Sequence, residues 1–175
     1  KAVILCKEWL KLEPDDPFAR HTLAAVSGLD VPARASDAYV QKAFDSFAAS
    51  FEVKLAKLHY QAPALVAGRL ADAGLPQARA LDVLDAGCGT GLCGPLVAPY
   101  ARRLVGVDLS EGMLTHAKEK NVYDELVRTE LTAYLRDHHD AFDLIVSADT
   151  LVYFGALDDV AGAAARLEQE QRVAV

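Results

Sequence analysis

The sequence of 175 residues is 52% hydrophobic and 25% charged and has a formal net charge of −7. These proportions are typical of one folded domain, or of one domain with a small appendage. They exclude a disordered tail, a collagen-like fibre and a disulfide-rich mini-protein. Acidic side chains concentrate in residues 81–175, which carry eight Lys and Arg against sixteen Asp and Glu. Because nucleic-acid binding needs a basic surface that releases counterions, we expect neither DNA nor RNA as a partner.

The three cysteines, Cys6, Cys88 and Cys93, show neither a C-x-x-C pair nor a zinc-binding spacing. We therefore expect reduced thiols, no metal site and a cytoplasmic location. The sequence has no run of 18 apolar residues and no basic segment followed by an apolar leader, so we expect no membrane contact. It begins at Lys1 rather than Met, which leaves open whether residues precede it.

Residues 1–35 are expected to form a pair of helices followed by a linker. An apolar helical period covers Ala2–Leu12, and a second helix is predicted over Phe18–Val26 with Asp16 as its N-cap. The intervening sequence, LKLEPDDPFARHTLA, resembles the junction between two tetratricopeptide repeats. Since one repeat cannot bury its own apolar face, this pair must pack on the following domain or belong to a longer array. Two interpretations stay open: a surface for protein contact, and a helical hairpin with no binding role.

Residues 36–80 are expected to form a helical cap over the domain that follows. A long helix is predicted over Asp37–Leu58, and another over Ala62–Ala73, which Gly74 ends. Three aromatic residues share one face of the first helix at spacings of three and four: Phe44, Phe47 and Phe51. Such a stripe is more typical of a packed core than of a cofactor site.

Residues 81–175 alternate between strand and helix patterns. Strands are predicted at Leu81–Ala86, Leu104–Asp108, Leu126–Arg128 and Phe142–Ser147. Helices are predicted at Gly94–Tyr100, Ser110–Lys120, Leu131–Asp137 and Leu157–Glu170. This alternation predicts an α/β domain with a Rossmann-like, doubly wound and mostly parallel sheet.

The most informative segment is VLDAGCGTGLCG, residues 83–94. A strand runs into Gly87, Gly89 and Gly91, so a ligand can approach bare main chain before the next helix begins. Asp108 ends the next strand, 21 residues after Gly87, where a carboxylate can accept both ribose hydroxyls. The pattern predicts a nucleoside-containing cofactor at the carboxyl edge of the sheet. The alternative is glycine packing with an incidental acid.

The identity of the cofactor depends on Asp85, which ends the first strand. Residues 89–94 also satisfy the dinucleotide pattern G-x-G-x-x-G, so an NAD-dependent oxidoreductase stays an alternative. An anionic pyrophosphate, however, would be repelled by a carboxylate at the start of the loop. An acid at this position instead suits a ligand with a cationic end.

This segment resembles motif I of class I S-adenosylmethionine-dependent methyltransferases, and LVGVDLS resembles the segment that follows it. The whole chain is most similar to bacterial predicted methyltransferases that carry tetratricopeptide sequence. The resemblance implies that Asp85 and the glycine loop hold the methionine moiety, Asp108 the ribose and Glu130 the adenine amine, with Met113 beside the adenine. The implied cofactor-binding set is Asp85, Gly87, Cys88, Gly89, Gly91, Asp108, Leu109, Met113, Glu130 and Leu131.

The segment SADTLVYF, residues 147–154, resembles the fourth motif of the same family, where the loop faces the acceptor. By that resemblance Asp149 and Tyr153 are candidate acceptor-side residues. If the reaction needs a general base, the candidates are His59, Tyr60 and Asp149. The segment lacks the Asn/Asp-Pro-Pro-aromatic and Pro-Cys motifs of DNA methyltransferases, which again disfavours nucleic acid.

The resemblance implies methyl transfer to a small molecule, or to a protein, by in-line displacement. The alternatives are a non-catalytic adaptor that binds the cofactor or a peptide, and the oxidoreductase. The sheet of this family has seven strands, whereas only residues 172–175 could begin a fifth here. We therefore expect a C-terminally incomplete domain, in which the strand at 142–147 would form an exposed edge.

Overall fold

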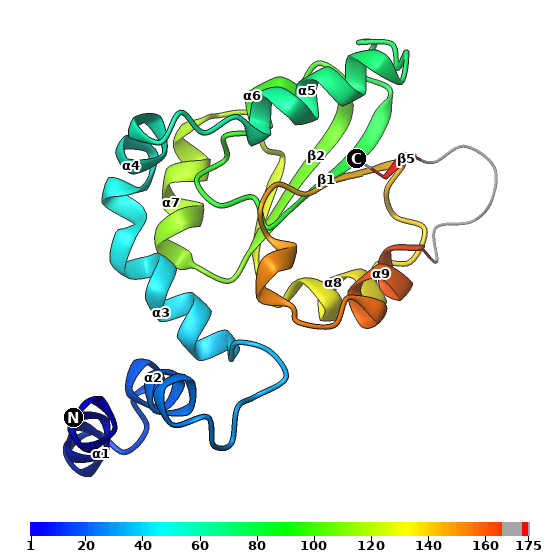
Figure 1. Cartoon of the computed structure of the whole chain (residues 1–175). Coiled ribbons are helices and arrows are strands. Elements are labelled where there is room, and N and C mark those ends of the chain that lie inside the picture. Colours follow the sequence, from blue (N-terminus) through cyan, green and yellow to red (C-terminus); the bar gives the residue numbers. More distant parts are fainter. Residues whose placement is uncertain (166–172, 175) are drawn as a thin grey trace.

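A parallel β-sheet forms the centre of the chain (Figure 1). The computed structural model describes residues 1–165 and 173–174. Within these residues the strand order is β3-β2-β1-β4-β5, and every paired register is parallel. The strands are β1 (Leu81–Ala86), β2 (Ala101–Asp108), β3 (Glu125–Arg128), β4 (Leu144–Val146) and β5 (Val173–Ala174).

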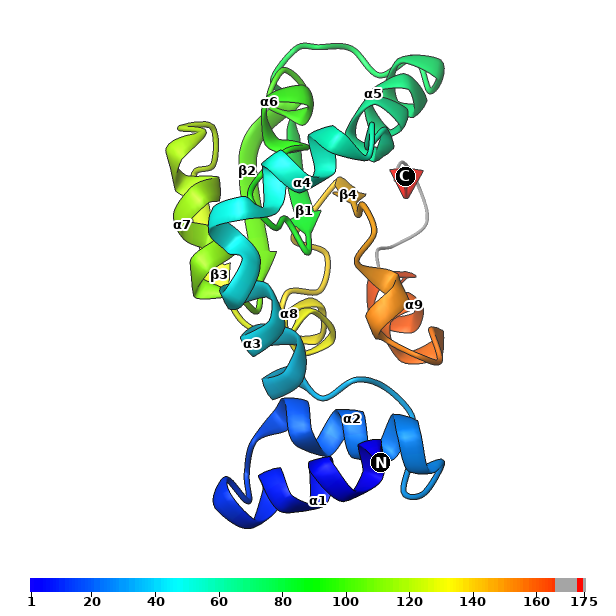
Figure 2. The same cartoon turned by 60° about the vertical axis from the view of Figure 1, so that its left-hand side comes forward.

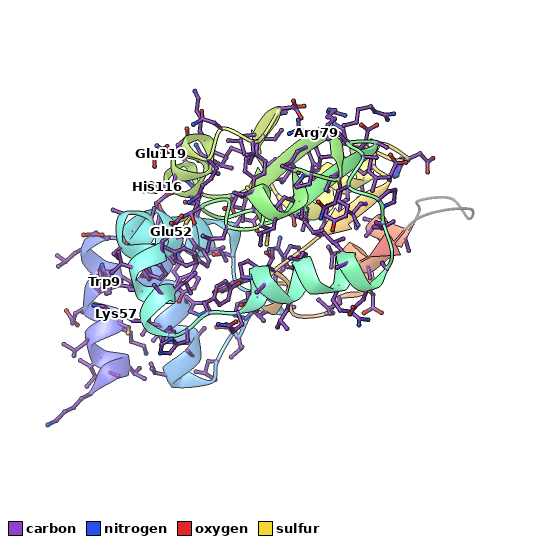
Figure 3. The ribbon with its side chains drawn as sticks, turned by 90° about the horizontal axis from the view of Figure 1, so that it is seen from above. Trp9, Glu52, Lys57, Arg79, His116 and Glu119 are labelled. Atoms are coloured by element: carbon purple, nitrogen blue, oxygen red, sulfur yellow. The ribbon has the colours of Figure 1, made fainter. Side chains whose placement is uncertain are left out.

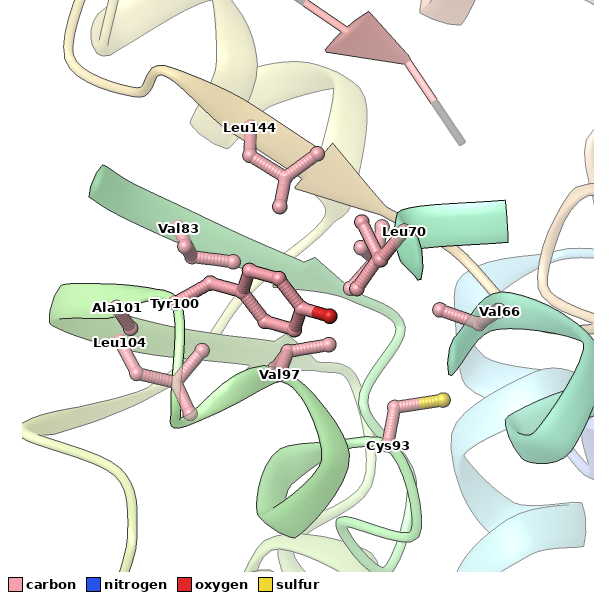
Figure 4. Close-up of a cluster of buried hydrophobic side chains, with 10 residues drawn as sticks. Val66, Leu70, Val83, Cys93, Val97, Tyr100, Ala101, Leu104 and Leu144 are labelled. Carbon is pink, nitrogen blue, oxygen red and sulfur yellow. The ribbon is translucent and has the colours of Figure 1, made fainter. Parts of the chain in front are cut away.

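Helices cover both faces of this sheet, as the sequence pattern predicted. The helices are α1 (Ala2–Leu12), α2 (Pro17–Ser27), α3 (Asp37–Phe47), α4 (Phe51–Lys57), α5 (Ala62–Asp72), α6 (Gly94–Val97), α7 (Glu111–Glu119), α8 (Leu131–Asp137) and α9 (Asp158–Ala165). Helices α5 and α6 bury Leu70 and Val97 against Val83 and Leu144 on one face (Figure 4). Helices α8 and α9 pack against the other face around Leu84. The doubly wound α/β fold is therefore confirmed.

The side chains of the strands alternate between these two cores. In β1, Val83 belongs to the α5–α6 core and Leu84 to the α8–α9 core. In β2, Leu104 likewise belongs to the α5–α6 core and Val105 to the α8–α9 core. Because successive side chains of a strand point to opposite faces, this pattern leaves both faces apolar, as a buried parallel sheet requires.

The N-terminal helices lie below the sheet domain in the view of Figure 2, where α1 packs on α2 and α2 on α3. The predicted N-cap of α2 is confirmed, because Asp16 accepts the Ala19 N–H at 2.8 Å. Ser36 caps α3 in the same way by accepting the Tyr39 N–H at 3.2 Å. The division into units at residues 1–35, 36–80 and 81–175 stays a prediction.

The helix predicted over residues 37–58 is not continuous, which corrects the sequence analysis. A 3-10 turn at Ala48–Ser50 separates α3 from α4. At this turn the buried Ala48 packs closely against Gly112 of α7. A Cβ added to Gly112 would lie only 3.1 Å from the Ala48 Cβ. Periodicity missed the break because Ala and Ser are compatible with a helix interior.

Two elements of the sheet domain, α6 and β4, are shorter than the sequence analysis predicted. Helix α6 ends at Val97 rather than at residue 100, and β4 is shorter than the predicted strand. Strand β4 is not an exposed edge over its first two residues, because β5 pairs with Leu144 and Ile145. The expected end of the last helix at Glu170 lies outside the described residues. None of the described helices combines the length and apolar character needed to cross a membrane.

Candidate functional site

A cavity of about 270 Å³ opens where the loops after β1, β2, β3 and β4 meet. The carboxyl ends of parallel strands lie at one edge of a sheet, which is where ligands of open α/β folds bind. Residues from α3, α4 and the turn before α5 form the opposite wall, including Phe44, Phe51 and Tyr60. The helices at residues 37–57, which we call the roof, therefore cover the edge of the sheet.

The glycine loop after β1 turns sharply at Gly87 and Gly89, which have φ angles of +72° and +54°. A Cβ on Gly89 would meet nothing within 4 Å, so main chain is open to a ligand there. A Cβ on Gly87 would instead lie 2.1 Å from Oγ1 of Thr150. The Thr150 hydroxyl donates to the Gly87 carbonyl oxygen at 3.2 Å. The loop after β4 is thus seated directly on the glycine loop.

Asp108 at the end of β2 faces the cavity and holds the neighbouring main chain. Its carboxylate accepts the N–H groups of Gly89 and Ser110, each at 2.9 Å. Burial raises the pKa of Asp108, and these backbone hydrogen bonds oppose that shift. Each carboxylate oxygen accepts one of these bonds and has a further lone pair for a ligand hydroxyl.

Asp85 at the end of β1 is 2% exposed and lines the same cavity. Its carboxylate accepts a hydrogen bond from the Tyr123 hydroxyl at 2.6 Å. Burial raises the pKa of Asp85 to about 7, assisted by the negative charge of Asp108, while the Tyr123 bond opposes the shift. The protein has therefore buried an acid beside a cavity without giving it a positive partner among the described residues.

The adenine-side candidates also lie on the cavity wall. Glu130 caps α8 by accepting the Ala133 N–H through Oε2 at 2.8 Å. Its other oxygen, Oε1, is buried and has no hydrogen-bond partner among the described residues. Three apolar candidates complete this part of the wall: Leu109, Met113 and Leu131. Glu130 therefore keeps one buried acceptor without a partner at the cavity wall, and an unpaired buried acceptor is costly.

The acceptor-side candidates come from the loop after β4. Asp149, at a φ of +56°, and Tyr153 both line the cavity. Tyr60, before α5, lines it as well, and burial together with the Asp149 carboxylate raises the pKa of the Tyr60 phenol. His59 is exposed and does not appear in the cavity wall. The structure thus brings Tyr60, rather than its neighbour, to the site.

The structure brings most of the predicted cofactor residues together on one wall, Cys88 included, but Gly91 does not line the cavity. A Cβ on Gly91 would lie 3.0 Å from the Tyr123 ring, so this glycine makes room for Tyr123. Sequence reasoning missed Thr90, which lines the cavity and is buried. Its position inside the glycine loop was the available signal. No sequence signal pointed to Tyr123 or Thr150.

Polar contacts attach the roof to α7. Asp45 of α3 accepts the Ser110 hydroxyl at 2.5 Å and the Gly112 N–H at 3.1 Å, both at the start of α7. Glu52 of α4 pairs with Lys120 at 2.8 Å, and Figure 3 shows Glu52 near the α7 residues His116 and Glu119. The wall opposite the sheet is therefore tied to the same helix that follows Asp108.

Comparison with known proteins gives a family for the second half of the chain. Residues 83–169 match a family model described as "Methyltransferase domain". Human methyltransferase-like protein 27 is 37% identical over 84 residues, which are 47% of this chain and 34% of that protein. Magnesium-protoporphyrin O-methyltransferase of Rhodobacter capsulatus is 36% identical over 80 residues, which are 43% of this chain and 35% of that protein. The chain thus spans about a third of each of these curated relatives.

A solved structure shows the same fold. The TehB-like S-adenosylmethionine-dependent methyltransferase of Corynebacterium glutamicum is 30% identical, with a TM-score of 0.50. The likeness covers 72% of this chain and 66% of that one. The match to the family model begins within β1 and contains the glycine loop, Asp108 and Glu130. Residues 83–169 therefore form a methyltransferase domain, similar to that of S-adenosylmethionine-dependent methyltransferases.

Proposed function

We propose that this chain binds S-adenosylmethionine in the cavity and transfers its methyl group to a small-molecule acceptor, with a protein side chain as the alternative. The observation that carries the proposal is one cavity wall on which Asp85, Asp108 and Glu130 surround the bare main chain of Gly89. This set offers a carboxylate for an ammonium group, acceptors for ribose hydroxyls and an acceptor for an amine. A dinucleotide would place its anionic pyrophosphate beside Asp85, so the same wall disfavours NAD.

The residues present fit this cofactor, because several of them lack a partner that it would supply. The buried carboxyl of Asp85 has no positive neighbour among the described residues. Glu130 Oε1 is buried and unpaired there too. In our proposal Asp85 holds the methionyl ammonium, Thr90 donates to the methionyl carboxylate and Glu130 accepts from the adenine amine. Asp108 accepts from the ribose.

The cofactor, when bound, supplies a methyl group on a positively charged sulfur. The chain's own contribution is then to orient and to exclude water. The Thr150 hydrogen bond fixes the acceptor loop on the glycine loop, and the roof encloses the cavity. Holding two reactants in position removes much of the entropic barrier of a bimolecular reaction. The phenols of Tyr60 and Tyr153 stay protonated at neutral pH, since burial raises both pKa values, so they serve as hydrogen-bond donors.

Isothermal titration calorimetry with S-adenosylmethionine, S-adenosylhomocysteine and NAD tests the proposal. We expect the first two to bind and NAD not to bind. Asp108→Ala should weaken S-adenosylhomocysteine binding by about tenfold or more, because it removes charge-assisted hydrogen bonds. Asp82→Asn is the matched control, because Asp82 lies at the start of β1 and pairs with Arg102 outside the cavity. Binding of NAD alone, or unchanged affinity in Asp108→Ala, would contradict the proposal.

A turnover assay distinguishes the proposed enzyme from the non-catalytic alternative, because only an enzyme releases S-adenosylhomocysteine when an acceptor is added.

For the N-terminal pair of helices we keep the proposal of a tetratricopeptide-like, bacterial type of methyltransferase. What supports it is the packing of α1 on α2 and the exposure of Ile4, Leu5 and Leu12 on α1. An apolar helix face of this kind suits contact with a further helix or another protein.

A further inference from the structure

The charged groups of the cavity wall are mainly acidic. Among the described residues that line it, four carry a carboxylate and one, Arg34, carries a positive charge. Arg34 already pairs with Asp37 at 2.6 Å. The cofactor contacts proposed above use three of the four carboxylates, Asp85, Asp108 and Glu130. The fourth, Asp149, has no role in holding the cofactor.

Aromatic side chains surround the part of the wall that contains Asp149. The negative charge of Asp149 acts on both Tyr60 and Tyr153. Together with burial it raises the pKa of each phenol. Phe44 packs edge-on against Tyr153, with ring centroids 5.3 Å apart, and against Phe51 at 6.1 Å. The exposed Asp149 carboxylate therefore lies on the cavity wall beside two phenols, next to this aromatic cluster.

A carboxylate among aromatic rings is suited to a positively charged nitrogen. The carboxylate gives a charge-assisted hydrogen bond, and the negative faces of the rings attract the cation. On the basis of the methyltransferase function proposed above, we propose that the acceptor is an aromatic or apolar amine, bound as an ammonium ion by Asp149. An anionic acceptor would meet the Asp149 carboxylate and lose its hydration without gaining a free positive partner among the described residues of the wall, which disfavours carboxylic acids and phosphates.

Methyl transfer requires a free lone pair on nitrogen, so the bound ammonium must first lose a proton. Because Asp149 is exposed, this proton can pass to solvent, which leaves a neutral amine held by the Asp149 carboxylate. The nitrogen would then form its bond to the methyl carbon as the carbon–sulfur bond breaks, with the electron pair kept by sulfur. The products would be a methylammonium ion, S-adenosylhomocysteine and one proton in solvent.

The test uses three probes of one shape: benzylamine, benzyl alcohol and benzoate. Each is titrated by calorimetry into the full chain saturated with S-adenosylhomocysteine, at pH 7.5. We expect saturable binding of benzylamine that is about tenfold or more tighter than that of the other two. Tighter binding of benzoate, or no saturable binding of benzylamine to this complex, would overturn the inference. Absence of S-adenosylhomocysteine binding would instead contradict the proposed function, so the two failures are distinguishable.

Asp149→Asn tests the residue itself. Asn adopts a positive φ angle readily, so the backbone at +56° is preserved while the charge is lost. We expect benzylamine affinity to fall about tenfold or more, with unchanged S-adenosylhomocysteine affinity. Asp137→Asn, at the exposed end of α8 and outside the cavity, is the matched control. Unchanged benzylamine binding in Asp149→Asn, or loss of its S-adenosylhomocysteine affinity, would refute the assignment.

Discussion

Three glycines of the loop after β1 are needed for three different reasons. Gly89 faces open space in the cavity, Gly87 makes room for Thr150, and Gly91 makes room for Tyr123. The sequence suggested a single role for all of them, which was access for a ligand. The structure leaves that role to Gly89 and shows that the other two allow separate segments to pack closely. A glycine pattern therefore identifies a loop more reliably than it identifies the function of each glycine.

Asp85 gives a prediction at the same scale, from the pH dependence of cofactor binding. Its pKa is raised from 3.8 to about 7, which corresponds to a destabilisation on the order of 4 kcal/mol once the group ionises. The folded state keeps the proton that the unfolded state loses, so this contribution lowers stability as pH rises from about 4 to 7. A bound ammonium group would stabilise the carboxylate and release the proton.

We therefore expect S-adenosylhomocysteine affinity to increase with pH between 5.5 and about 7 by up to tenfold per pH unit. Calorimetric titrations across this pH range measure the affinity. In Asp85→Asn, which keeps an acceptor for the Tyr123 hydroxyl, this increase should be absent, and the unliganded protein should lose less stability than wild type over the same range. An equal pH dependence in both proteins would show that another group titrates.

At the scale of elements, the contact between the loops after β1 and β4 joins the cofactor side of the cavity to the acceptor side. Thr150 lies on Gly87, and Ser147 donates to the Ala86 carbonyl oxygen at 3.0 Å. The neighbouring residue Asp149 is held at a positive φ angle by a loop fixed in this way. The position of the acceptor-side residues thus depends on a glycine in a different loop.

Gly87→Ala should destabilise the fold by about 2 to 4 kcal/mol, because it combines backbone strain with a clash. The added Cβ would lie within 3 Å of three Thr150 atoms. Gly89→Ala is the matched control, since it also has a positive φ angle but meets no atom within 4 Å. Urea denaturation should show a larger loss for Gly87→Ala, and Thr150→Gly should reduce that loss in the double variant. Equal losses in the two alanine variants would mean that Thr150 does not matter.

At the scale of the whole molecule, the roof and the sheet edge form one site from distant parts of the chain. The roof is attached to α7 by Asp45 and by the Glu52–Lys120 pair, whereas α1 lies apart from the cavity wall (Figure 2). A ligand that contacts both walls should therefore stabilise the roof as well as the glycine loop.

Hydrogen exchange measures this coupling. Saturation with S-adenosylhomocysteine should slow amide exchange in residues 37–57 and in the glycine loop, because opening of either wall then costs part of the binding free energy. Exchange in α1 should not change and provides an internal control. Protection confined to the glycine loop would show that the roof does not contact the cofactor.

The sequence by itself determined the elements of the sheet domain and the residues at strand ends. The strand β1 and helices α1 and α8 have the predicted bounds, because their apolar spacing and flanking residues act locally. Asp85, Asp108 and the glycine loop were predictable for the same reason. Their neighbours along the chain place them at the carboxyl edge of a parallel sheet.

Only the tertiary structure decided which side chains meet around that edge. Tyr123 with Asp85, Thr150 with Gly87 and Asp45 with Ser110 are separated by 38, 63 and 65 residues. Such pairs have no spacing that a single sequence reveals, because they form when separate elements pack at one edge. The same packing brings Tyr60, but not His59, to the cavity wall that also contains Asp149. The chemistry of the glycine loop could thus be predicted from local sequence, whereas the residues that surround the loop are known only from the tertiary structure.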